Sequence, residues 1–337
     1  MNTRKILAGM PASFPASVRE SDRPLYLMMN LETGCPLRCL KCAQPGQGRQ
    51  VGTPLTLAKR ERIIEVAAQC GVKALVIIGA GEPSTPQNFS AFVRPVIETA
   101  HRHSLLTVMF TTALGINREQ AIFYRDHGVT IVVSLDSLLP ETYRKLTGNG
   151  NLAHTLQNIA VLREVYHNTA REEGGVRTVR LGINCTIQRP NVGELEQIRE
   201  FSNSDMLFVA NAPMPAGRFA VYANWDETVG DANLDRFNKL AREMSDTGGH
   251  SSIAEGACSY FNRGITVDVD GQFLSCGYAA ASAEFLGNIE EPTLEAMMDH
   301  YHRVRGGYHA WCQSAGRQPS CPLRDPDYQG FLLHLRR

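Results

Sequence analysis

The chain has 337 residues, of which 43% are hydrophobic and 20% are charged, as is usual for a globular protein with a substantial core. Lysine plus arginine and aspartate plus glutamate both number 34, so no net charge would attract nucleic acid or an anionic membrane. No apolar run is long enough to span a bilayer, and residues 1–24 show no signal-peptide pattern. With nine cysteines, this predicts a cytoplasmic protein whose cysteines serve metals or chemistry.

Strand-like and helix-like segments alternate between residues 25 and 210. The predicted strands cover residues 25–31, 74–79, 105–111, 130–134, 178–187 and 206–210. The predicted helices cover residues 57–69, 89–103, 118–127, 140–146, 152–167 and 192–201. Short continuous apolar runs such as 74–79 are typical of strands buried on both faces of a parallel sheet. The six strand–helix units therefore predict an α/β fold, with parallel strands joined by right-handed crossovers.

The alternation stops near residue 226, where a predicted helix over 233–244 leads to a Gly-Gly boundary. The chain then divides into an N-terminal extension (1–24), an α/β domain (25–225), a linker helix (226–250) and a small α+β domain (251–337).

Three cysteines, Cys35, Cys39 and Cys42, lie in one predicted loop after the first strand, separated by three and then two residues. Thiolates are soft ligands that suit iron–sulfur clusters, zinc or copper(I). Three thiolates leave one iron of a four-iron cluster open to a small molecule, whereas a structural zinc site needs a fourth ligand. The next cysteine, Cys70, falls inside a predicted helix. A zinc loop or a chance cluster is the alternative.

This spacing resembles the signature of the radical S-adenosylmethionine (radical SAM) enzymes. The resemblance implies a partial (β/α)6 barrel with its chemistry at the C-terminal ends of the strands. It also implies a [4Fe-4S] cluster held by Cys35, Cys39, Cys42 and SAM, whose reductive cleavage yields a 5′-deoxyadenosyl radical. The sequence departs from the family at Lys41, because the residue before the third cysteine is often aromatic there.

The resemblance also implies SAM-binding roles for residues at the ends of the predicted strands. Gly81-Glu82-Pro83 follows the second strand and matches the family segment that binds the amino group of SAM. Other residues are candidates for contacts with the ribose, the methionine end or the adenosine of SAM, or with a carboxylate of SAM or substrate. These residues are Thr112, Ser134, Asp136, Asn184 and Arg218. Ordinary turns, helix caps and a surface arginine are the alternatives for these residues.

A second group of cysteines follows in the small domain, around a hairpin predicted at Asp270-Gly271. The arrangement resembles the SPASM or twitch extension of radical SAM enzymes, which implies an auxiliary [4Fe-4S] cluster. The implied ligands are Cys258, Cys276, Cys312 and Cys321, and the wide gap before the last of them departs from the usual spacing. A zinc site made by the same four cysteines is the alternative. The two remaining cysteines, Cys70 and Cys185, are predicted to be buried packing residues.

These resemblances predict a radical SAM oxidoreductase whose auxiliary cluster accepts an electron from the substrate. The extension 1–24 is too short for a peptide-recognition domain, which favours a sugar-, aminocyclitol- or nucleoside-like substrate. The expected protein partner is a flavodoxin- or ferredoxin-type reductant. The alternatives are a peptide- or protein-modifying maturase and a sugar epimerase or decarboxylase, and a zinc-stabilised binding module is the alternative that is not an enzyme.

Overall fold

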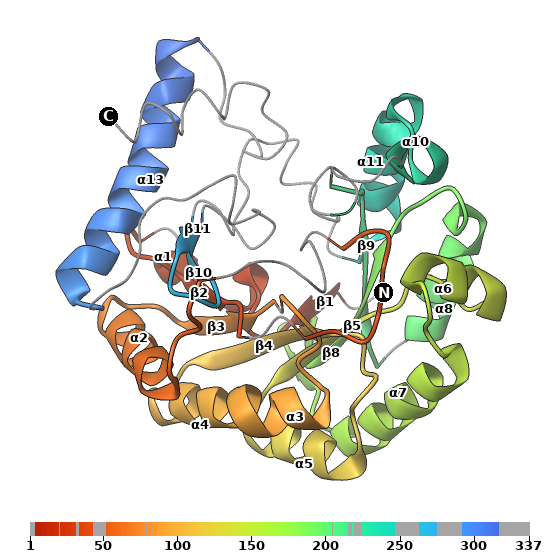
Figure 1. Ribbon diagram of the computed structural model, residues 1–337, viewed down its shortest axis with the longest axis horizontal. Coiled ribbons are helices and arrows are strands. Elements are labelled where there is room, and N and C mark those ends of the chain that lie inside the picture. Colours follow the sequence, from red (N-terminus) through yellow and green to blue (C-terminus); the bar gives the residue numbers. More distant parts are fainter. Residues whose placement is uncertain are drawn as a thin grey trace.

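The computed structural model describes residues 4–19, 21–31, 34–42, 52–78, 80–203, 205–214, 218, 224–246, 263–274 and 292–316. Its centre is an eight-stranded sheet in the order β11-β10-β2-β3-β4-β5-β8-β9 (Figure 1). Six of the strands lie side by side in the sheet in the order in which they occur along the chain, and all pair in parallel, as the sequence predicts. They are β2 (Tyr26–Met29), β3 (Ala74–Ile77), β4 (Leu106–Thr111), β5 (Thr130–Ser134), β8 (Leu181–Thr186) and β9 (Leu207–Asn211).

Helices follow these strands and form an arc around them in Figure 1, which gives the partial barrel. They are α2 (Leu57–Gln69), α3 (Pro86–Asn88), the π-helical η2 (Phe89–Val93), α4 (Arg94–Arg102), α5 (Arg118–Asp126), α6 (Pro140–Thr147), α7 (Leu152–Tyr166), η3 (Val192–Glu194) and α8 (Leu195–Ser202). Side chains fix several helix starts, because Thr56, Asn117 and Asn151 each accept a hydrogen bond from the backbone N–H three residues later. The helical segment predicted over 89–103 begins earlier, at Pro86, since Thr85 caps it.

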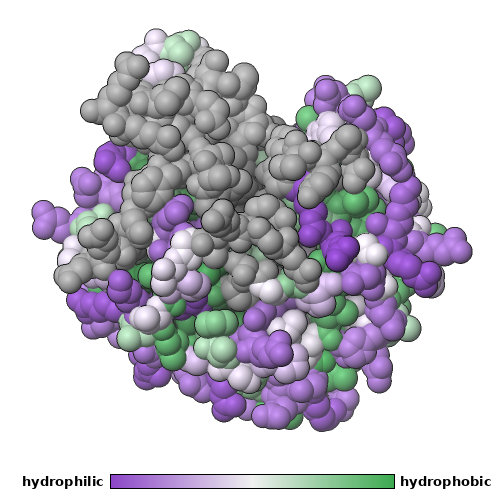
Figure 2. Space-filling view, in the orientation of Figure 1, coloured by the Kyte–Doolittle hydropathy of each residue, from purple (hydrophilic) through white to green (hydrophobic). Residues whose placement is uncertain are grey.

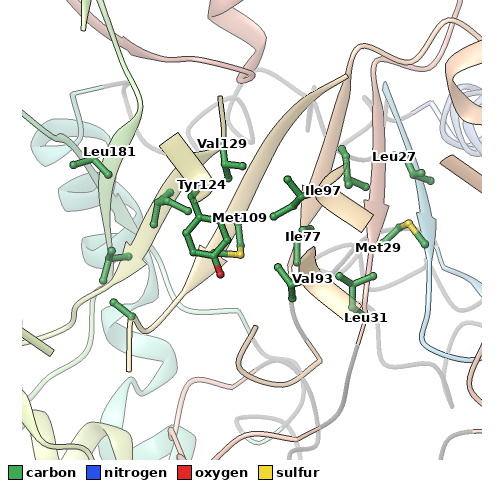
Figure 3. Close-up of a cluster of buried hydrophobic side chains, with 14 of the residues drawn as sticks. Leu27, Met29, Leu31, Ile77, Val93, Ile97, Met109, Tyr124, Val129 and Leu181 are labelled. Carbon is green, nitrogen blue, oxygen red and sulfur yellow. The ribbon is translucent and has the colours of Figure 1, made fainter. Parts of the chain in front are cut away.

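Alternate residues of each strand enter two separate apolar clusters. Leu27 and Met29 of β2 belong to an outer cluster between the sheet and the helices, part of which is shown in Figure 3. Tyr26 and Met28 belong to an inner cluster on the other face of the sheet, together with Leu7 from the N-terminal segment. Burial on both faces explains why these strands are continuous apolar runs in the sequence. Hydrophilic residues predominate along the left, lower and right edges of the coloured part of the molecule in Figure 2.

The N-terminal extension is more structured than the sequence predicts. It contains β1 (Arg4–Leu7), the 3-10 helix η1 (Pro11–Ser13) and α1 (Ala16–Arg19). Strand β1 pairs in parallel with β7 (Val176–Val179), which forms a hairpin with β6 (Arg171–Glu173). The single strand predicted over 178–187 is therefore wrong. It divides at Arg180, because Val179 pairs with β1 in a small sheet whereas β8 pairs with β5 in the large one.

The hairpin predicted at Asp270-Gly271 is confirmed, with β10 (Gly264–Val267) antiparallel to β11 (Phe273–Leu274) and Gly271 at a φ of 87°. Strand β10 also pairs in parallel with β2, so the hairpin extends the edge of the large sheet. The domain boundaries proposed from the sequence stay predictions.

Three further helices complete the described part of the chain: α10 (Asn224–Thr228), α11 (Asp231–Met244) and α13 (Leu294–Ser314). The sequence pattern predicts the last of these helices over residues 293–304, and the structure continues it for ten more residues. A buried stripe through Val304, Tyr308 and Cys312 holds the extra turns against the core, despite the two glycines at 306 and 307. No helix in the described ranges combines the length and the apolar character needed to cross a bilayer.

Candidate functional site

The cysteine loop lies just beyond the C-terminal end of β2, and backbone hydrogen bonds fix it on two sides. The N–H groups of Arg38 and Leu40 donate to the carbonyls of Thr147 and Leu146 at the end of α6, over 2.9 and 3.0 Å. On the other side, the N–H of Glu82 donates to Gly34 O over 2.9 Å. The loop is therefore held between the segments that follow β3 and β5, at the C-terminal edge of the parallel sheet.

Cys35, Cys39 and Cys42 are thiols, each half-buried, within this one loop. Burial raises the pKa of Cys35 to about 12, against the lowering effect of the Leu37 backbone N–H, and the charges of Glu82 and Cys42 raise it further. Burial also raises the pKa of Cys39, although Lys41 acts to lower it. Because a thiolate disfavours ionisation of the neighbouring thiols, all three ionise together only beside a strongly positive partner.

Glu82 has a carboxylate that the chain itself fully engages, and its side chain is buried. Ser84 donates to Oε1 from its backbone N–H at 3.0 Å and from its hydroxyl at 2.6 Å, and the Thr111 hydroxyl donates to the same oxygen. Thr112 donates to Oε2 from its N–H at 2.8 Å and from its hydroxyl at 2.6 Å. Glu82 thus joins the loop after β3 to the end of β4.

Gly81 contacts the cysteine loop so closely that a side chain would not fit. A Cβ atom built there would lie 2.3 Å from Gly34 O. The Gly81-Glu82-Pro83 segment and the cysteine loop therefore form one packed unit. This leaves the backbone of the segment, rather than the Glu82 carboxylate, as the group available to a ligand. The ribose contact predicted for Thr112 stays a prediction, and the contact observed for its hydroxyl is Glu82.

Asp136 follows β5 and forms an ion pair that the sequence does not predict. Lys41 Nζ lies 2.7 Å from Asp136 Oδ1, with the two side chains 14% and 4% exposed. The backbone N–H of Thr186 donates to the same oxygen at 2.8 Å. Burial acts to lower the pKa of Lys41, but the charge and hydrogen bond of Asp136 hold it above its usual value.

Ser134 and Asn184 are brought side by side, as register partners in neighbouring strands β5 and β8. The amide of Asn211, at the end of β9, donates to Asn184 Oδ1. Asn211 and Lys41 are the site residues that sequence reasoning missed. Alternation along β9 is the signal that could have placed Asn211 on the same face of the sheet as Asn184.

Arg218 lies against the cysteine loop. Its backbone N–H donates to Cys42 O at 2.9 Å, and its Nη1 donates to Cys39 O at 3.3 Å. The predicted contact of Arg218 with a carboxylate of SAM or substrate stays a prediction. Arg218 supplies a second cation beside the thiols, and it acts to lower the pKa of Cys35.

Residues 29–178 match the model of the Radical SAM superfamily, which spans the cysteine loop, the Gly81-Glu82-Pro83 segment and the end of β5. The chain carries a radical SAM domain. This family implies an enzyme with a [4Fe-4S] cluster and SAM, and it agrees with the resemblance seen in the sequence.

Curated relatives match less than half of the chain. The GTP 3',8-cyclase of Aeromonas hydrophila is 31% identical over 146 residues, which make up 41% of this chain and 42% of that protein. The GTP 3',8-cyclase of Petrotoga mobilis is 29% identical over 150 residues, or 43% of this chain and 45% of that protein. The chain therefore matches less than half the length of these relatives.

Solved structures share the fold over more of the chain. Streptococcus suis SuiB bound to its precursor peptide SuiA has a TM-score of 0.62 at 17% identity, covering 84% of this chain and 67% of that one. The anSMEcpe structure with bound AdoMet and the Cp18Cys peptide has a TM-score of 0.58 at 13% identity, covering 91% and 87%. At these identities the likeness concerns the fold alone.

The thiols of the radical SAM loop fit a cluster better than a single ion. Within the described ranges, no three His, Cys, Asp or Glu side chains are gathered closely enough to hold one metal ion. A cubane binds each thiolate at a separate iron, so its ligands lie further apart than those around one zinc ion. Its iron atoms would also supply the positive charge that the mutually repelling thiolates need.

The other cysteines divide into two groups. Cys70 and Cys185 are buried in the outer cluster, as predicted for packing residues. Cys312 is also buried there, on the inward stripe of α13. The predicted partners of Cys312 in an auxiliary cluster, Cys258, Cys276 and Cys321, lie outside the described residues, so that ligand set stays a prediction.

Proposed function

We propose that this chain is a radical SAM oxidoreductase that removes two hydrogens from a small polar metabolite. The observation that carries the proposal is the loop of three thiols at the C-terminal edge of the parallel sheet, packed against the Gly81-Glu82-Pro83 segment. When bound, the cluster and SAM would supply a 5′-deoxyadenosyl radical, which takes a hydrogen atom from the substrate.

The chain's own residues position this chemistry. Arg218 and the end of α6 hold the loop carbonyls and N–H groups, so the three thiols are presented from a fixed backbone. The amide pair of Asn184 and Asn211 offers neutral donors and acceptors near the same edge, which suits hydroxyls or a nucleobase edge. The inner cluster beneath them is apolar and keeps water out of the barrel.

The oxidation must also dispose of one electron and one proton. Cys258, Cys276, Cys312 and Cys321 would hold an auxiliary [4Fe-4S] cluster, as in the twitch arrangement that the C-terminal cysteines resemble, and that cluster would supply the electron acceptor. The proton passes to a base or to water, and the substrate hydroxyl or amine carbon becomes a carbonyl or imine. A flavodoxin- or ferredoxin-type protein is the proposed source of the electron that starts each turnover.

The proteins that this chain resembles favour two different substrate classes. The relatives named GTP 3',8-cyclase act on a nucleotide, which supports a nucleoside-like small molecule. The second candidate is modification of a peptide, favoured by the peptide-bound SuiB and anSMEcpe structures that share the fold. Both candidates use the same radical step.

The decisive experiment is an anaerobic assay of reconstituted protein with reductant and SAM. We expect about eight iron atoms per chain, as two cubanes, and formation of 5′-deoxyadenosine. Replacing Cys35, Cys39 and Cys42 together by alanine should remove about half the iron and all SAM cleavage. Replacing the buried Cys185 by alanine is the matched control and should leave the iron content unchanged. Full cleavage activity in the triple variant would refute the proposal.

A further inference from the structure

Lys41 occupies a position between two proposed cluster ligands, two residues after Cys39 and next to Cys42. A lysine in a loop usually extends into water, because its ammonium is strongly hydrated. Here the side chain is only 14% exposed, and its ammonium lies 2.7 Å from Asp136 Oδ1. The positive charge is therefore held inside the protein beside the thiols.

The carboxylate partner is itself fixed by the neighbouring strands. Asp136 follows β5, its Oδ1 accepts a hydrogen bond from the Thr186 N–H at 2.8 Å, and its side chain is 4% exposed. Its backbone carbonyl accepts a further hydrogen bond from Asn191 Nδ2 at 2.7 Å. Because the carboxylate cannot move away, the Lys41 ammonium has one position relative to the loop.

A buried ion pair is weak evidence for stability, since removing two charges from water offsets most of their attraction. The pair is better explained by what the fixed charge does to its surroundings. Reduction adds a negative charge to an iron–sulfur cluster, and a nearby cation favours the reduced form. Lys41 is part of the cysteine loop itself, whereas Asp136 contacts the loop through the Lys41 ammonium. The positive charge of Lys41 therefore acts more strongly on the thiols than the negative charge of Asp136 does.

We infer that the Lys41–Asp136 ion pair sets the reduction potential of the cluster that binds SAM, with Lys41 raising the potential and Asp136 moderating that effect. Lys41 is thus a positioning residue, and the inference rests on the proposed function. It also gives a role to the position where related enzymes often have an aromatic residue. Arg218 contributes a second cation to the same loop, through Nη1 and Cys39 O at 3.3 Å.

The test is an EPR-monitored redox titration of anaerobically reconstituted protein, following the signal that changes when SAM is added. Lys41→Met should shift the midpoint potential to a more negative value, because the cation is lost. Asp136→Asn should shift it to a more positive value, because the cation loses its counter-charge while the amide oxygen still accepts both hydrogen bonds. Lys41→Arg should keep the wild-type value.

The control is Arg118→Met, which breaks an ion pair of the same length, 2.7 Å, whose side chains are 60% and 62% exposed. It should not shift the potential, because solvent screens that pair. Shifts of the same sign in Lys41→Met and Asp136→Asn, or no shift in either at wild-type iron content, would overturn the inference. If Lys41→Met does not load iron, Asp136→Asn decides alone. Wild-type protein that forms no cluster would instead overturn the proposed function.

Discussion

Glu82 Oε2 accepts two hydrogen bonds from Thr112, one from the backbone N–H at 2.8 Å and one from the hydroxyl at 2.6 Å. With the three donors on Oε1, this carboxylate connects the end of β4 to the loop that packs on Gly34. Glu82, which is predicted to bind SAM, therefore also positions the segment against which the cysteine loop packs.

Replacing Glu82 by glutamine should lower the free energy of unfolding by about 2 kcal/mol, because its NH₂ group would face donors that have no other acceptor among the described residues. Urea unfolding of the metal-free protein measures this change. Glu98→Gln is the matched control, because Glu98 pairs with Arg94 at 3.2 Å with side chains 40% and 49% exposed. That control should change stability by less than about 0.5 kcal/mol. Equal effects of the two substitutions would contradict a special role for Glu82.

The sequence predicted the parts of the fold that depend on local pattern. The order of the six central strands β2, β3, β4, β5, β8 and β9 follows from apolar runs separated by helical periodicity. The cysteine loop is visible as three residues of one kind at short spacing. The rest depends on residues far apart in the chain. Strand β1 pairs with β7 across about 170 positions, and Lys41 meets an aspartate 95 positions away. The periodicity of the sequence does not reveal such contacts, because they form only when the strands are assembled.

A buried histidine makes a pH-dependent contribution to stability. The ring of His300 on α13 stacks on Phe273 of β11, with centroids 3.8 Å apart and planes at 15°. Burial, assisted by the charge of Arg303, lowers the pKa of His300 to about 3. Between pH 6.5 and 3 the unfolded chain binds a proton that the folded chain does not, so stability falls as the pH falls through this window.

His300→Phe should remove this dependence while keeping the stack. Below pH 6.5, the free energy of unfolding of the wild type should fall more steeply than that of the variant, by up to about 1.4 kcal/mol per pH unit. Urea unfolding of both metal-free proteins at pH 8, 6 and 5 gives the comparison, with pH 8 as the reference at which His300 is neutral in both states. Parallel pH profiles would contradict the prediction, because they would show that the pKa of His300 is the same in the folded and the unfolded chain.

The proposed auxiliary cluster makes a separate prediction about product formation. Replacing Cys258 or Cys276 by alanine should spare reductive cleavage of SAM and stop product formation, if that cluster accepts the substrate electron. Simultaneous measurement of 5′-deoxyadenosine and product separates the two steps. Loss of the folded protein would mean that the metal chiefly stabilises the C-terminal segment. An unchanged product yield would show that the cluster is no acceptor.

The positions of Cys70 and Cys185 favour oxidation over epimerisation. An epimerase must return a hydrogen atom to the substrate radical, and a thiol is a suitable donor. Seven of the nine cysteines are the proposed ligands of iron–sulfur clusters. The two that remain are buried in the outer apolar cluster, on the helix side of the sheet. A thiol behind a strand cannot reach a substrate held at the strand ends.

We therefore expect a product two mass units lighter than the substrate when the anaerobic assay is run with candidate sugars and nucleosides. Mass spectrometry in D₂O provides the check, because an oxidised product gains no carbon-bound deuterium whereas an epimer has an unchanged skeleton and one deuterium from solvent. Cys312→Ala identifies the donor in that second case, since Cys312 is buried on α13 and is the proposed ligand with the least usual spacing. An isomeric, singly deuterated product that disappears in Cys312→Ala would replace oxidation with epimerisation and would remove Cys312 from the auxiliary ligand set.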